Sequence, residues 1–525
     1  MLLSRQAVND YMDRRFDSFT WMKRLSREQI LREIATLKVK PVFKTDPWLH
    51  QLVCFWIGLH YPRFLYLLDM GLGKSKILSD LITQIQRERK LEGALVFVPR
   101  LTNIDSWIES LTEHSQLEPW PVKVSDIDEK WELLSRPRGD VTLIDYQGFH
   151  LATTKKVAGK GKSKKMVRDD KKIKLLQRQY NVIGIDESHK LKNHNNLWFG
   201  LIEHMTRSAE FCYATTGTLF GKEVEDLWSQ FRLIDGGETF GENLGLFRAA
   251  FFNAKTHPWK GTTYEFNPRQ DKLLHTMLQH RSLRYDEHEV LDLPKRVNRV
   301  VHCEMADEQR EQYLRHLEGI INAEGNLEAM DAAWLRMRQI VSGYLAWNDS
   351  HGKHVLPFKE NPKMDELERL IDEMGDSKIV VCYDYTETGR LIVERVKAMG
   401  LGYEWFYGGT KDKSASRRRF LDDPTCRVFV MNSEAGGTGN DGLQKVARYM
   451  VFYETPCPPI TRKQTEKRVH RPGQTERVFI YDIVMRKSLD KGILDQIQQG
   501  NDLYTKVVNG RRVGRSFFME TFMAG

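Results

Sequence analysis

Asp69-Met70-Gly71-Leu72-Gly73-Lys74-Ser75-Lys76-Ile77 is a glycine-rich segment between an apolar run, residues 64–68, and a helical pattern, residues 78–86. The run predicts a buried strand, so we expect a strand-to-helix turn. Because glycine lacks a Cβ, backbone N–H groups in such a turn can surround phosphate oxygens, and the helix N-terminus favours negative charge. Lys74 is placed to reach the β- and γ-phosphates, and Ser75 to hold Mg²⁺. The alternative is an ordinary glycine turn. The predicted phosphate site comprises Met70, Gly71, Leu72, Gly73, Lys74, Ser75 and Lys76.

Length and composition indicate a soluble chain of several domains. For 525 residues we expect about three domains, and 41% apolar with 29% charged residues argues against disorder. The six cysteines are scattered without a C-x-x-C pair, which argues against a disulfide framework or a structural zinc site. The N-terminus lacks the apolar core of a signal peptide, and no run approaches 18 uncharged apolar residues. We therefore expect a cytoplasmic or otherwise intracellular protein with no membrane partner, whose net charge of +9 favours a polyanion.

Two series of apolar, strand-like runs divide the chain into two α/β blocks. Buried β-branched runs that alternate with helical patterns are typical of a parallel sheet with helices on both faces. The first series comprises residues 64–68, 95–98, 141–144, 182–185 and 211–214, and the second comprises residues 379–383, 428–431, 449–453 and 478–484. The predicted domains are an N-terminal helical extension (1–45), a first block (46–235), a mostly helical spacer (236–359), a second block (360–505) and a C-terminal tail (506–525).

One segment of the first block, residues 154–178, is strongly basic. Between Lys155 and Lys174 ten of twenty residues are Lys or Arg, against two acids. With two glycines and little apolar surface to bury, the segment predicts a mobile surface loop. The loop is either a solvated insertion without a specific role or a contact for the DNA backbone.

A second motif, Ile183-Gly184-Ile185-Asp186-Glu187-Ser188-His189-Lys190, ends another predicted buried strand. Two carboxylates at such a strand end are costly to bury unless a cation or a substrate uses them. In a P-loop enzyme, an acidic residue here holds Mg²⁺ and its neighbour polarises the attacking water. We assign Asp186, with Ser75, to Mg²⁺ and Glu187 to the water. ATP and Mg²⁺ are the expected cofactors.

Together with further motifs, these segments resemble superfamily-two helicases and ATPases, specifically the Swi/Snf-like DNA translocases. Residues 69–75 resemble the family's D-E-M-G-L-G-K-T, and residues 186–193 (DESHKLKN) resemble its D-E-A-H-[RK]-[IL]-K-N. The family also lacks the first P-loop glycine, whose place Leu68 takes here. The remaining matches are Thr216-Gly217-Thr218 with Leu227-Trp228, Asp292-Leu293-Pro294-Lys295, Ala435-Gly436-Gly437-Thr438-Gly439 and Gln464-Thr465-Glu466-Lys467-Arg468-Val469-His470-Arg471-Pro472-Gly473-Gln474. The resemblance spans about residues 46 to 505 and is strongest to compact, stand-alone bacterial or phage members.

The resemblance implies an α/β fold of two tandem RecA-like parallel-sheet lobes joined by the helical spacer. It implies an ATP hydrolase whose catalytic residues come from both lobes, with Gln464, Arg468 and Arg471 supplied by the second. Guanidinium groups stabilise charge on a transferring phosphoryl group, so catalysis would require closure of the lobes. The two arginines would share one face if that segment is helical. Gln51 falls where the family places its adenine-reading glutamine.

In the family, loops at the sheet edges carry the nucleic-acid contacts. The implied contacts are Arg100, Thr102, Asn103, Tyr146, Thr216, Thr218, Ser433, Gly437 and Thr438. Thr216 and Thr218 would also couple the lobes. Three departures affect this region: Glu434 stands where the family usually has Arg, Thr455-Pro456-Cys457-Pro458-Pro459 replaces a Trp-Asn-Pro segment, and Leu219 replaces a proline.

The predicted function is an ATP-dependent, DNA-stimulated motor that translocates on double-stranded DNA, as a monomer that a targeting protein could direct. A strand-separating or fork-reannealing, branch-migrating helicase is the first alternative, and RNA as the track is another. An ATP-switched DNA-binding scaffold is the alternative of a different class. The intact Lys74, Asp186, Glu187, Arg468 and Arg471 argue against that scaffold.

Overall fold

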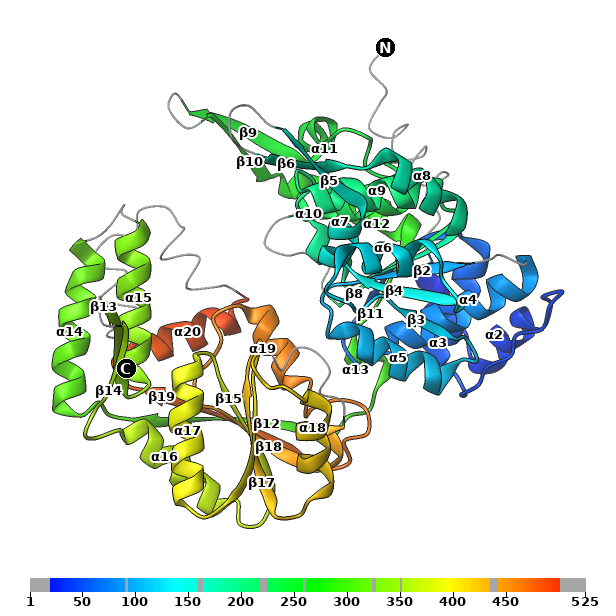
Figure 1. Cartoon of the computed structure of the whole chain (residues 1–525). Helices are drawn as coiled ribbons and strands as arrows, with labels where there is room; N and C mark the ends of the chain where they lie inside the picture. Colours follow the sequence, from blue (N-terminus) through cyan, green and yellow to red (C-terminus); the bar gives the residue numbers. More distant parts are fainter. Residues whose placement is uncertain are drawn as a thin grey trace. The chain divides into compact units, whose positions relative to one another are not determined.

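The long apolar runs become largely buried strands, and these strands form two separate parallel sheets. The computed structural model describes residues 19–89, 93–158, 164–217, 224–257, 261–322, 327–349, 352–434 and 442–500. The chain divides into two units, Met1–Leu291 and Asp292–Gly525 (Figure 1). The predicted α/β class with two parallel-sheet, RecA-like lobes is therefore confirmed.

The first unit contains a seven-stranded sheet with the order β11-β1-β8-β7-β2-β4-β3, in which all pairs are parallel. β8 separates β1 from β7, so the turn after β1 and the acidic motif after β7 emerge at the same carboxyl edge of the sheet. Ligand sites in open parallel sheets form at this edge. The strands are β1 (Arg63–Leu68), β2 (Ala94–Val98), β3 (Pro119–Pro121), β4 (Val141–Asp145), β7 (Val182–Asp186), β8 (Phe211–Thr216) and β11 (Ser282–Tyr285).

Helices cover both faces of this sheet because alternate strand residues point to opposite sides. Phe64 and Tyr66 of β1 pack in one apolar cluster, and Leu65 and Leu67 pack in the other. The first cluster includes α2 (Arg27–Ile34), α3 (Leu49–His60), α4 (Lys74–Arg89) and α5 (Asn103–His114). The second includes α6 (Ile127–Ser135), α7 (Tyr146–Thr153), α8 (Asp170–Gln179), α9 (Leu197–Ser208), α10 (Asp226–Asp235), α11 (Leu244–Phe251) and α12 (Asp271–Arg281).

Short elements complete the first unit. Two antiparallel hairpins, β5–β6 and β9–β10, stand apart from the main sheet. The short elements are η1 (Thr20–Arg24), β5 (Thr154–Ala158), β6 (Lys164–Arg168), η2 (Ser188–Leu191), β9 (Phe252–His257), β10 (Gly261–Phe266), η3 (Pro268–Gln270) and α13 (Glu287–Val290).

The second unit contains a six-stranded parallel sheet with the order β12-β19-β18-β15-β17-β16. Three further helices, α14, α15 and α20, pack in an apolar cluster of their own beside it. The strands are β12 (Arg296–Cys303), β15 (Lys378–Tyr383), β16 (Gly402–Phe406), β17 (Cys426–Asn432), β18 (Ala447–Phe452) and β19 (Val478–Met485), with the hairpin β13 (Tyr344–Asp349) and β14 (Gly352–Pro357). The helices are α14 (Asp307–Asn322), α15 (Leu327–Val341), α16 (Pro362–Glu373), α17 (Thr386–Ala398), α18 (Lys413–Asp422), η5 (Leu443–Lys445), α19 (Pro459–Glu466) and α20 (Leu489–Gln498).

The structure differs from the predicted domain boundaries. Residues 236–359 do not form a separate spacer, because β11 joins the first sheet and β12 joins the second. Each of these strands pairs an edge that would otherwise expose unsatisfied backbone groups. The division falls at Leu291, and the predicted tail 506–525 lies outside the described residues.

The prediction of a loop at residues 154–178 is also wrong. The described part of this segment consists of the β5–β6 hairpin and α8, and residues 159–163 lie outside the described residues. Backbone hydrogen bonds between β5 and β6 stabilise this segment, although its sequence offers few apolar residues to bury. Throughout the described part of the chain, no helix has the length and apolarity that crossing a membrane requires.

Candidate functional site

The turn after β1 depends on two glycines. Gly71 and Gly73 have φ values of 85° and 74°, in the left-handed region that side chains disfavour. A Cβ on Gly73 would lie 2.3 Å from Nε2 of Gln51. The Leu72 carbonyl accepts hydrogen bonds from His50 Nε2, at 2.8 Å, and Gln51 Nε2, at 3.3 Å. Helix α3, which carries His50 and Gln51, thus holds the turn in the shape of a phosphate cradle.

His50, on α3, supports this turn from outside it. Burial lowers the pKa of its imidazole from 6.5 to about 4, against the opposing effect of its bond to Leu72. A neutral imidazole at physiological pH can donate from Nε2 to the carbonyl of Leu72. The cradle therefore includes a residue that the sequence motif does not contain.

Lys74 connects the glycine turn to the acidic motif. Its ammonium lies 3.3 Å from Oε1 of Glu187 and 3.4 Å from the Leu68 carbonyl oxygen. Both charged side chains are largely buried, with 13% of Lys74 and 16% of Glu187 exposed. A Cβ on Gly217, at the end of β8, would lie 3.5 Å from the Lys74 ammonium. Three strand ends thus surround one cation whose charge suits a phosphate.

Glu187 occupies a strained position. Its φ of 52° is left-handed, which is unusual for a residue with a side chain and costs about 1 kcal/mol or more. His189 Nδ1 lies 3.3 Å from its second carboxylate oxygen and 3.0 Å from the hydroxyl of Thr216. Burial would raise the pKa of Glu187, but Lys74 and His189 hold it well below its ordinary value. Glu187 is therefore an ionised carboxylate aimed at the P-loop lysine.

Asp186 has a different electrostatic setting. Burial raises the pKa of its carboxyl, and the adjacent Glu187 charge raises it further. Its oxygens accept hydrogen bonds from Trp107 Nε1, at 3.0 Å, and Thr215 Oγ1, at 3.1 Å. Neighbouring carboxyls with oppositely shifted pKa values are typical of sites where the two perform different tasks.

Helix α5 contacts both of the predicted magnesium ligands. Trp107 donates to Asp186, and the hydroxyl of Ser110 donates to that of Ser75 at 2.8 Å. Because Trp107 and Ser110 are three residues apart on one helix face, Ser75 and Asp186 lie next to the same turn of α5. A hydroxyl and a carboxylate are ligands that Mg²⁺ accepts together with phosphate oxygens.

These groups fit a magnesium–nucleoside triphosphate. The backbone of the turn has the left-handed conformation that its two glycines permit, and Lys74 supplies a positive charge. Glu187 Oε2 is buried 3.3 Å from His189 Nδ1, and Oε1 lies 3.3 Å from the Lys74 ammonium, so both carboxylate oxygens lie close to a nitrogen of the site. The donor set therefore matches the group that the sequence predicted.

The second unit presents the predicted arginines on a turn rather than a helix. Helix α19 ends at Glu466, so Arg468 and Arg471 do not share a helical face, whereas Gln464 lies on α19 and is partly exposed. His470 Nε2 lies 3.0 Å from the Pro294 carbonyl oxygen. This contact holds the turn against the segment that precedes β12. Both arginines remain partly accessible to solvent.

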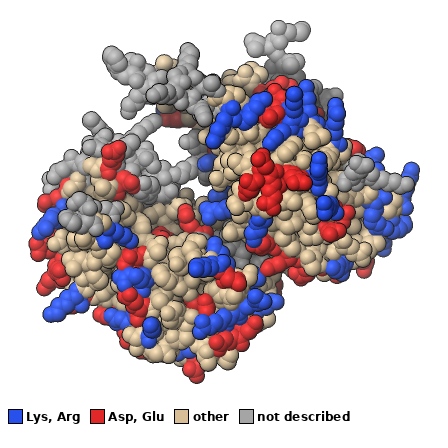
Figure 2. Space-filling view, in the orientation of Figure 1, with Lys and Arg blue, Asp and Glu red and all other residues tan. Residues whose placement is uncertain are grey.

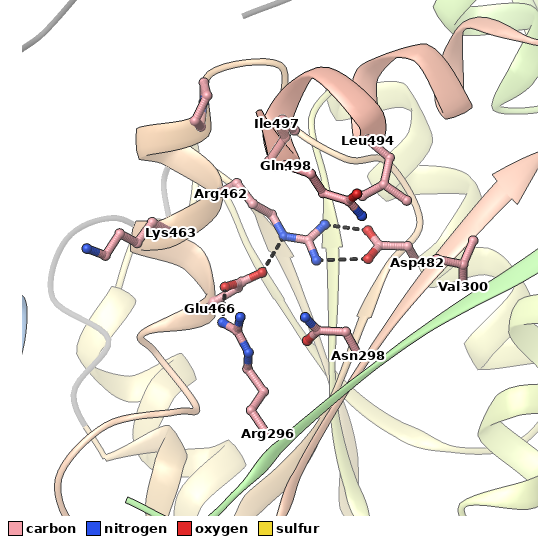
Figure 3. Close-up of a pocket in the computed structure, with 11 residues that line it drawn as sticks. Arg296, Asn298, Val300, Arg462, Lys463, Glu466, Asp482, Leu494, Ile497 and Gln498 are labelled. Atoms are coloured by element: carbon pink, nitrogen blue, oxygen red, sulfur yellow. Dashed lines mark hydrogen bonds and ion pairs between the residues drawn. The ribbon is translucent and has the colours of Figure 1, made fainter. Parts of the chain in front are cut away.

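An ionic network supports the helix that precedes this turn. The guanidinium of Arg462 bonds to both carboxylate oxygens of Asp482 and, at 2.7 Å, to Glu466 (Figure 3). Arg296 bonds to the other Glu466 oxygen. The network forms the wall of a pocket of about 320 Å³, and Arg462 itself is 6% exposed. Arg462 is a positioning residue that the sequence motifs did not reveal.

The structure corrects several of the predicted nucleic-acid contacts. Tyr146, Thr216 and Ser433 are buried, and their hydroxyls bond to Asp186 O, His189 and Tyr383 O, so these side chains are not exposed to a partner in this structure. Arg100 is exposed after β2, and Thr102 and Asn103 are partly exposed, so these three remain accessible. The remaining predicted contacts, Thr218, Gly437 and Thr438, lie outside the described residues, as does Leu219.

Two predicted nucleotide contacts also have other roles. Lys76 is buried and its ammonium bonds to Asp80 at 2.6 Å, so its side chain is committed to α4 and only its backbone N–H stays predicted as a phosphate contact. The Gln51 amide is buried, where it accepts from Trp48 N at 2.9 Å and donates to Leu72 O. The residues that sequence reasoning missed are His50, Trp107, Ser110, His189, Thr215 and Arg462, and only His189 lies within a recognised motif.

Comparisons with known proteins agree with this geometry. A family model described as the SNF2-related domain matches residues 63–347. Nuclear protein STH1/NPS1 of Saccharomyces cerevisiae is 23% identical over 478 residues, which are 84% of this chain and 33% of that protein. A chromatin structure-remodeling complex subunit, snf21 of Schizosaccharomyces pombe, is 22% identical over 467 residues, which are 84% of this chain and 37% of that protein. The chain therefore spans about a third of the length of these curated relatives.

Solved structures are similar as well. The Sulfolobus solfataricus SWI2/SNF2 ATPase core in complex with dsDNA is 19% identical, with a TM-score of 0.39, and the match covers 93% of this chain and 99% of that one. The family model alone matches more than half of the 525 residues, at the segment that contains the glycine turn and the acidic motif. The chain belongs to the SNF2-related domain family.

Proposed function

We propose that this chain hydrolyses ATP and uses the energy to translocate on double-stranded DNA. The single observation that carries the proposal is the approach of Lys74 to Glu187 at the carboxyl edge of the first sheet. It places a phosphate-binding cation beside an ionised carboxylate that can orient water. In-line transfer of a phosphoryl group to water requires this pair of tasks.

In this proposal, ATP and Mg²⁺ supply the phosphoryl group and the neutralising cation. Ser75 and Asp186 would hold the metal, and the backbone of residues 70–74 with the Lys74 side chain would hold the phosphates. Glu187 would orient the attacking water and accept its proton. Arg468 and Arg471 of the second unit would stabilise charge on the phosphoryl oxygens, which requires the two units to close during the cycle.

Duplex DNA is the proposed track. The relatives include a nuclear protein and a subunit of a chromatin structure-remodeling complex, and one similar solved structure is described as a complex with dsDNA. The exposed Arg100 and the partly exposed Thr102 and Asn103 offer cationic and polar groups at the carboxyl end of β2. Such groups contact phosphates without reading sequence. We further propose a monomeric, intracellular motor that a partner protein directs to its target.

The test compares ATP hydrolysis with duplex DNA, single-stranded DNA and RNA. Stimulation by duplex DNA supports the proposal, and stimulation by RNA or single strands without duplex contradicts it. Displacement of a third strand from a triplex, without separation of the underlying duplex, then distinguishes translocation from strand separation. An ATP-switched scaffold would bind DNA and ATP without turnover.

A further inference from the structure

The β5–β6 hairpin and α8, here called the basic arm, contain most of the chain's excess positive charge. The described residues of the arm, 155–158 and 164–178, carry nine Lys or Arg against two Asp, a net charge of +7, whereas the whole chain has a net charge of +9. None of the residues of the candidate ATP site lies in the arm, so nucleotide binding does not account for this charge.

The basic arm is anchored to the body of the first unit. At its base the Asp169 N–H donates to the Thr153 carbonyl at 2.9 Å, and the Lys172 ammonium donates to the Ala152 carbonyl at 2.8 Å. Ile173 and Leu176 of α8 are buried in the core of the unit. Cations on such a support lose little conformational freedom when they bind a partner.

The outer face of α8 presents a row of cations. Lys171, Lys174 and Arg178 are exposed and lie three and four residues apart, so they share one face of the helix. At 1.5 Å per residue the row spans about 10 Å, a length along which duplex DNA carries about six phosphate charges. Among the described residues, no carboxylate forms an ion pair with any of the three. Figure 2 shows Lys and Arg gathered over the part of the first unit where Figure 1 draws β6 and α8.

The hairpin extends this surface. Lys155 and Lys156 of β5 are exposed, and the Lys155 ammonium lies 3.9 Å from Asp169. Asp169 is largely committed to capping α8, where it accepts from the N–H groups of Lys171 and Lys172. Arg168 pairs with Asp170. The two acids of the arm therefore neutralise a minority of its cations.

We infer that the basic arm binds the sugar-phosphate backbone of duplex DNA at a place separate from the strand-end loops, an inference that rests on the proposed function. Helix α7 joins the carboxyl end of β4 directly to the arm, and its eight residues span about 12 Å. A duplex that contacts the strand ends of the first unit can thus reach the arm. Ammonium and guanidinium groups bind phosphates regardless of base sequence, which suits a motor that moves along its track.

The charge pattern favours DNA over an acidic protein segment. Among the described residues of the arm, the exposed large apolar side chains are Val157, on the hairpin, and Leu175, on α8. Protein partners are held mainly by apolar anchors in desolvated pockets, whereas nucleic-acid contacts are dominated by charge. A regular row of lysine and arginine side chains with isolated apolar side chains matches the second kind of surface.

The experiment measures how salt affects the affinity of the full chain for a labelled duplex. The test variant combines Lys171→Gln, Lys174→Gln and Arg178→Gln. A charge-matched control combines Arg32→Gln, Lys38→Gln and Arg89→Gln, three exposed positions of the same unit outside the arm. Anisotropy titrations between about 50 and 200 mM salt give the slope of log K against log salt concentration. We expect the slope of the test variant to fall by about two to three and its affinity to weaken at least about tenfold, while the control is unchanged.

Basal ATP hydrolysis without DNA should be the same in both variants and the wild type, which verifies folding. An unchanged slope in the test variant would overturn the inference, and so would an equal loss in the control. A loss confined to single-stranded RNA would also overturn it. Failure of the proposed function is distinguishable, because wild-type ATPase activity would then show no stimulation by duplex DNA before any variant is made.

Discussion

The ammonium of Lys74 lies 3.3 Å from the carboxylate of Glu187, although one residue follows β1 and the other follows β7. Without nucleotide the two charges neutralise each other inside a largely buried site. A phosphate that binds Lys74 would take the place of Glu187 and leave that carboxylate able to accept a proton from water. In the proposed mechanism the ion pair would therefore link nucleotide binding to the availability of Glu187 as a base, and each partner can be tested by itself.

Lys74→Ala should abolish measurable ATP binding. Removal of the cation leaves Glu187 buried without its partner and the phosphates without their charged contact, each of which costs about 2–5 kcal/mol. We expect affinity to fall at least about 100-fold in isothermal titration. Lys38→Ala, at an exposed position of the same unit, is the control and should bind normally. Retention of affinity by Lys74→Ala would contradict the assignment.

Glu187→Gln should preserve ATP binding and slow hydrolysis. Glutamine can still donate to and accept from its neighbours, but it cannot take a proton from water. Loss of a general base lowers rates by about 10²- to 10⁴-fold. Single-turnover hydrolysis with saturating ATP measures the chemical step directly. Normal turnover in this variant would show that another group orients the water.

Substitution of Arg468 and of Arg462 should affect different properties, although Arg462 lies on α19 and Arg468 lies in the turn that follows it. We expect Arg468→Ala to lower ATP hydrolysis by about 10³-fold with an unchanged melting temperature, because its guanidinium would act on the phosphoryl group. Arg462→Ala should destabilise the second unit by about 3–5 kcal/mol, because Asp482 would stay buried without its cation and Glu466 would keep only Arg296. Thermal unfolding and ATPase assays on both variants separate the roles. A stable Arg462→Ala protein would contradict the network's structural role.

The two motifs of the ATP site were predictable because each is continuous in sequence and follows a recognisable buried strand. The contacts that shape the site were not, because His50, Trp107 and Thr215 reach it from separate elements. The fold class followed from the period of the apolar runs. The basic segment was mistaken for a loop, because the pairing of β5 with β6 comes from backbone hydrogen bonds that composition does not encode.

The stability of the first unit should fall between pH 6.5 and about 4 because of His50. Burial lowers the pKa of this imidazole from 6.5 to about 4, so the unfolded chain binds a proton in this window and the folded chain does not. Stability is therefore full above pH 6.5 and falls as the pH drops, by up to about 1.4 kcal/mol per unit. Thermal melts at pH 7 and pH 5 measure the loss. His50→Gln should reduce the difference between the two melting temperatures, and an unchanged difference would exclude His50 as its source.

Gly73→Ala should disable the cradle more than its small size suggests. The φ of 74° would cost alanine about 1–2 kcal/mol, and the new Cβ would lie 2.3 Å from Nε2 of Gln51. Gln51 cannot easily move, because its amide bonds to Trp48 N and to Leu72 O. We expect ATP affinity to fall at least about tenfold, a change of about 1.4 kcal/mol in binding free energy.

A second substitution separates the two costs of Gly73→Ala. With Gln51→Ala the collision is absent and the backbone strain remains, so Gly73→Ala should cost less affinity in a Gln51→Ala background than in the wild type in the same titration. Gly200→Ala is the matched control, because no atom lies within 4 Å of its added Cβ and the residue is inside α9. That variant should bind ATP normally and gain about 0.5–1 kcal/mol of stability, since alanine is the better helix former. If Gly73→Ala bound ATP as tightly as Gly200→Ala does, the turn would not require glycine, and the phosphate cradle would have to lie elsewhere on the sheet edge.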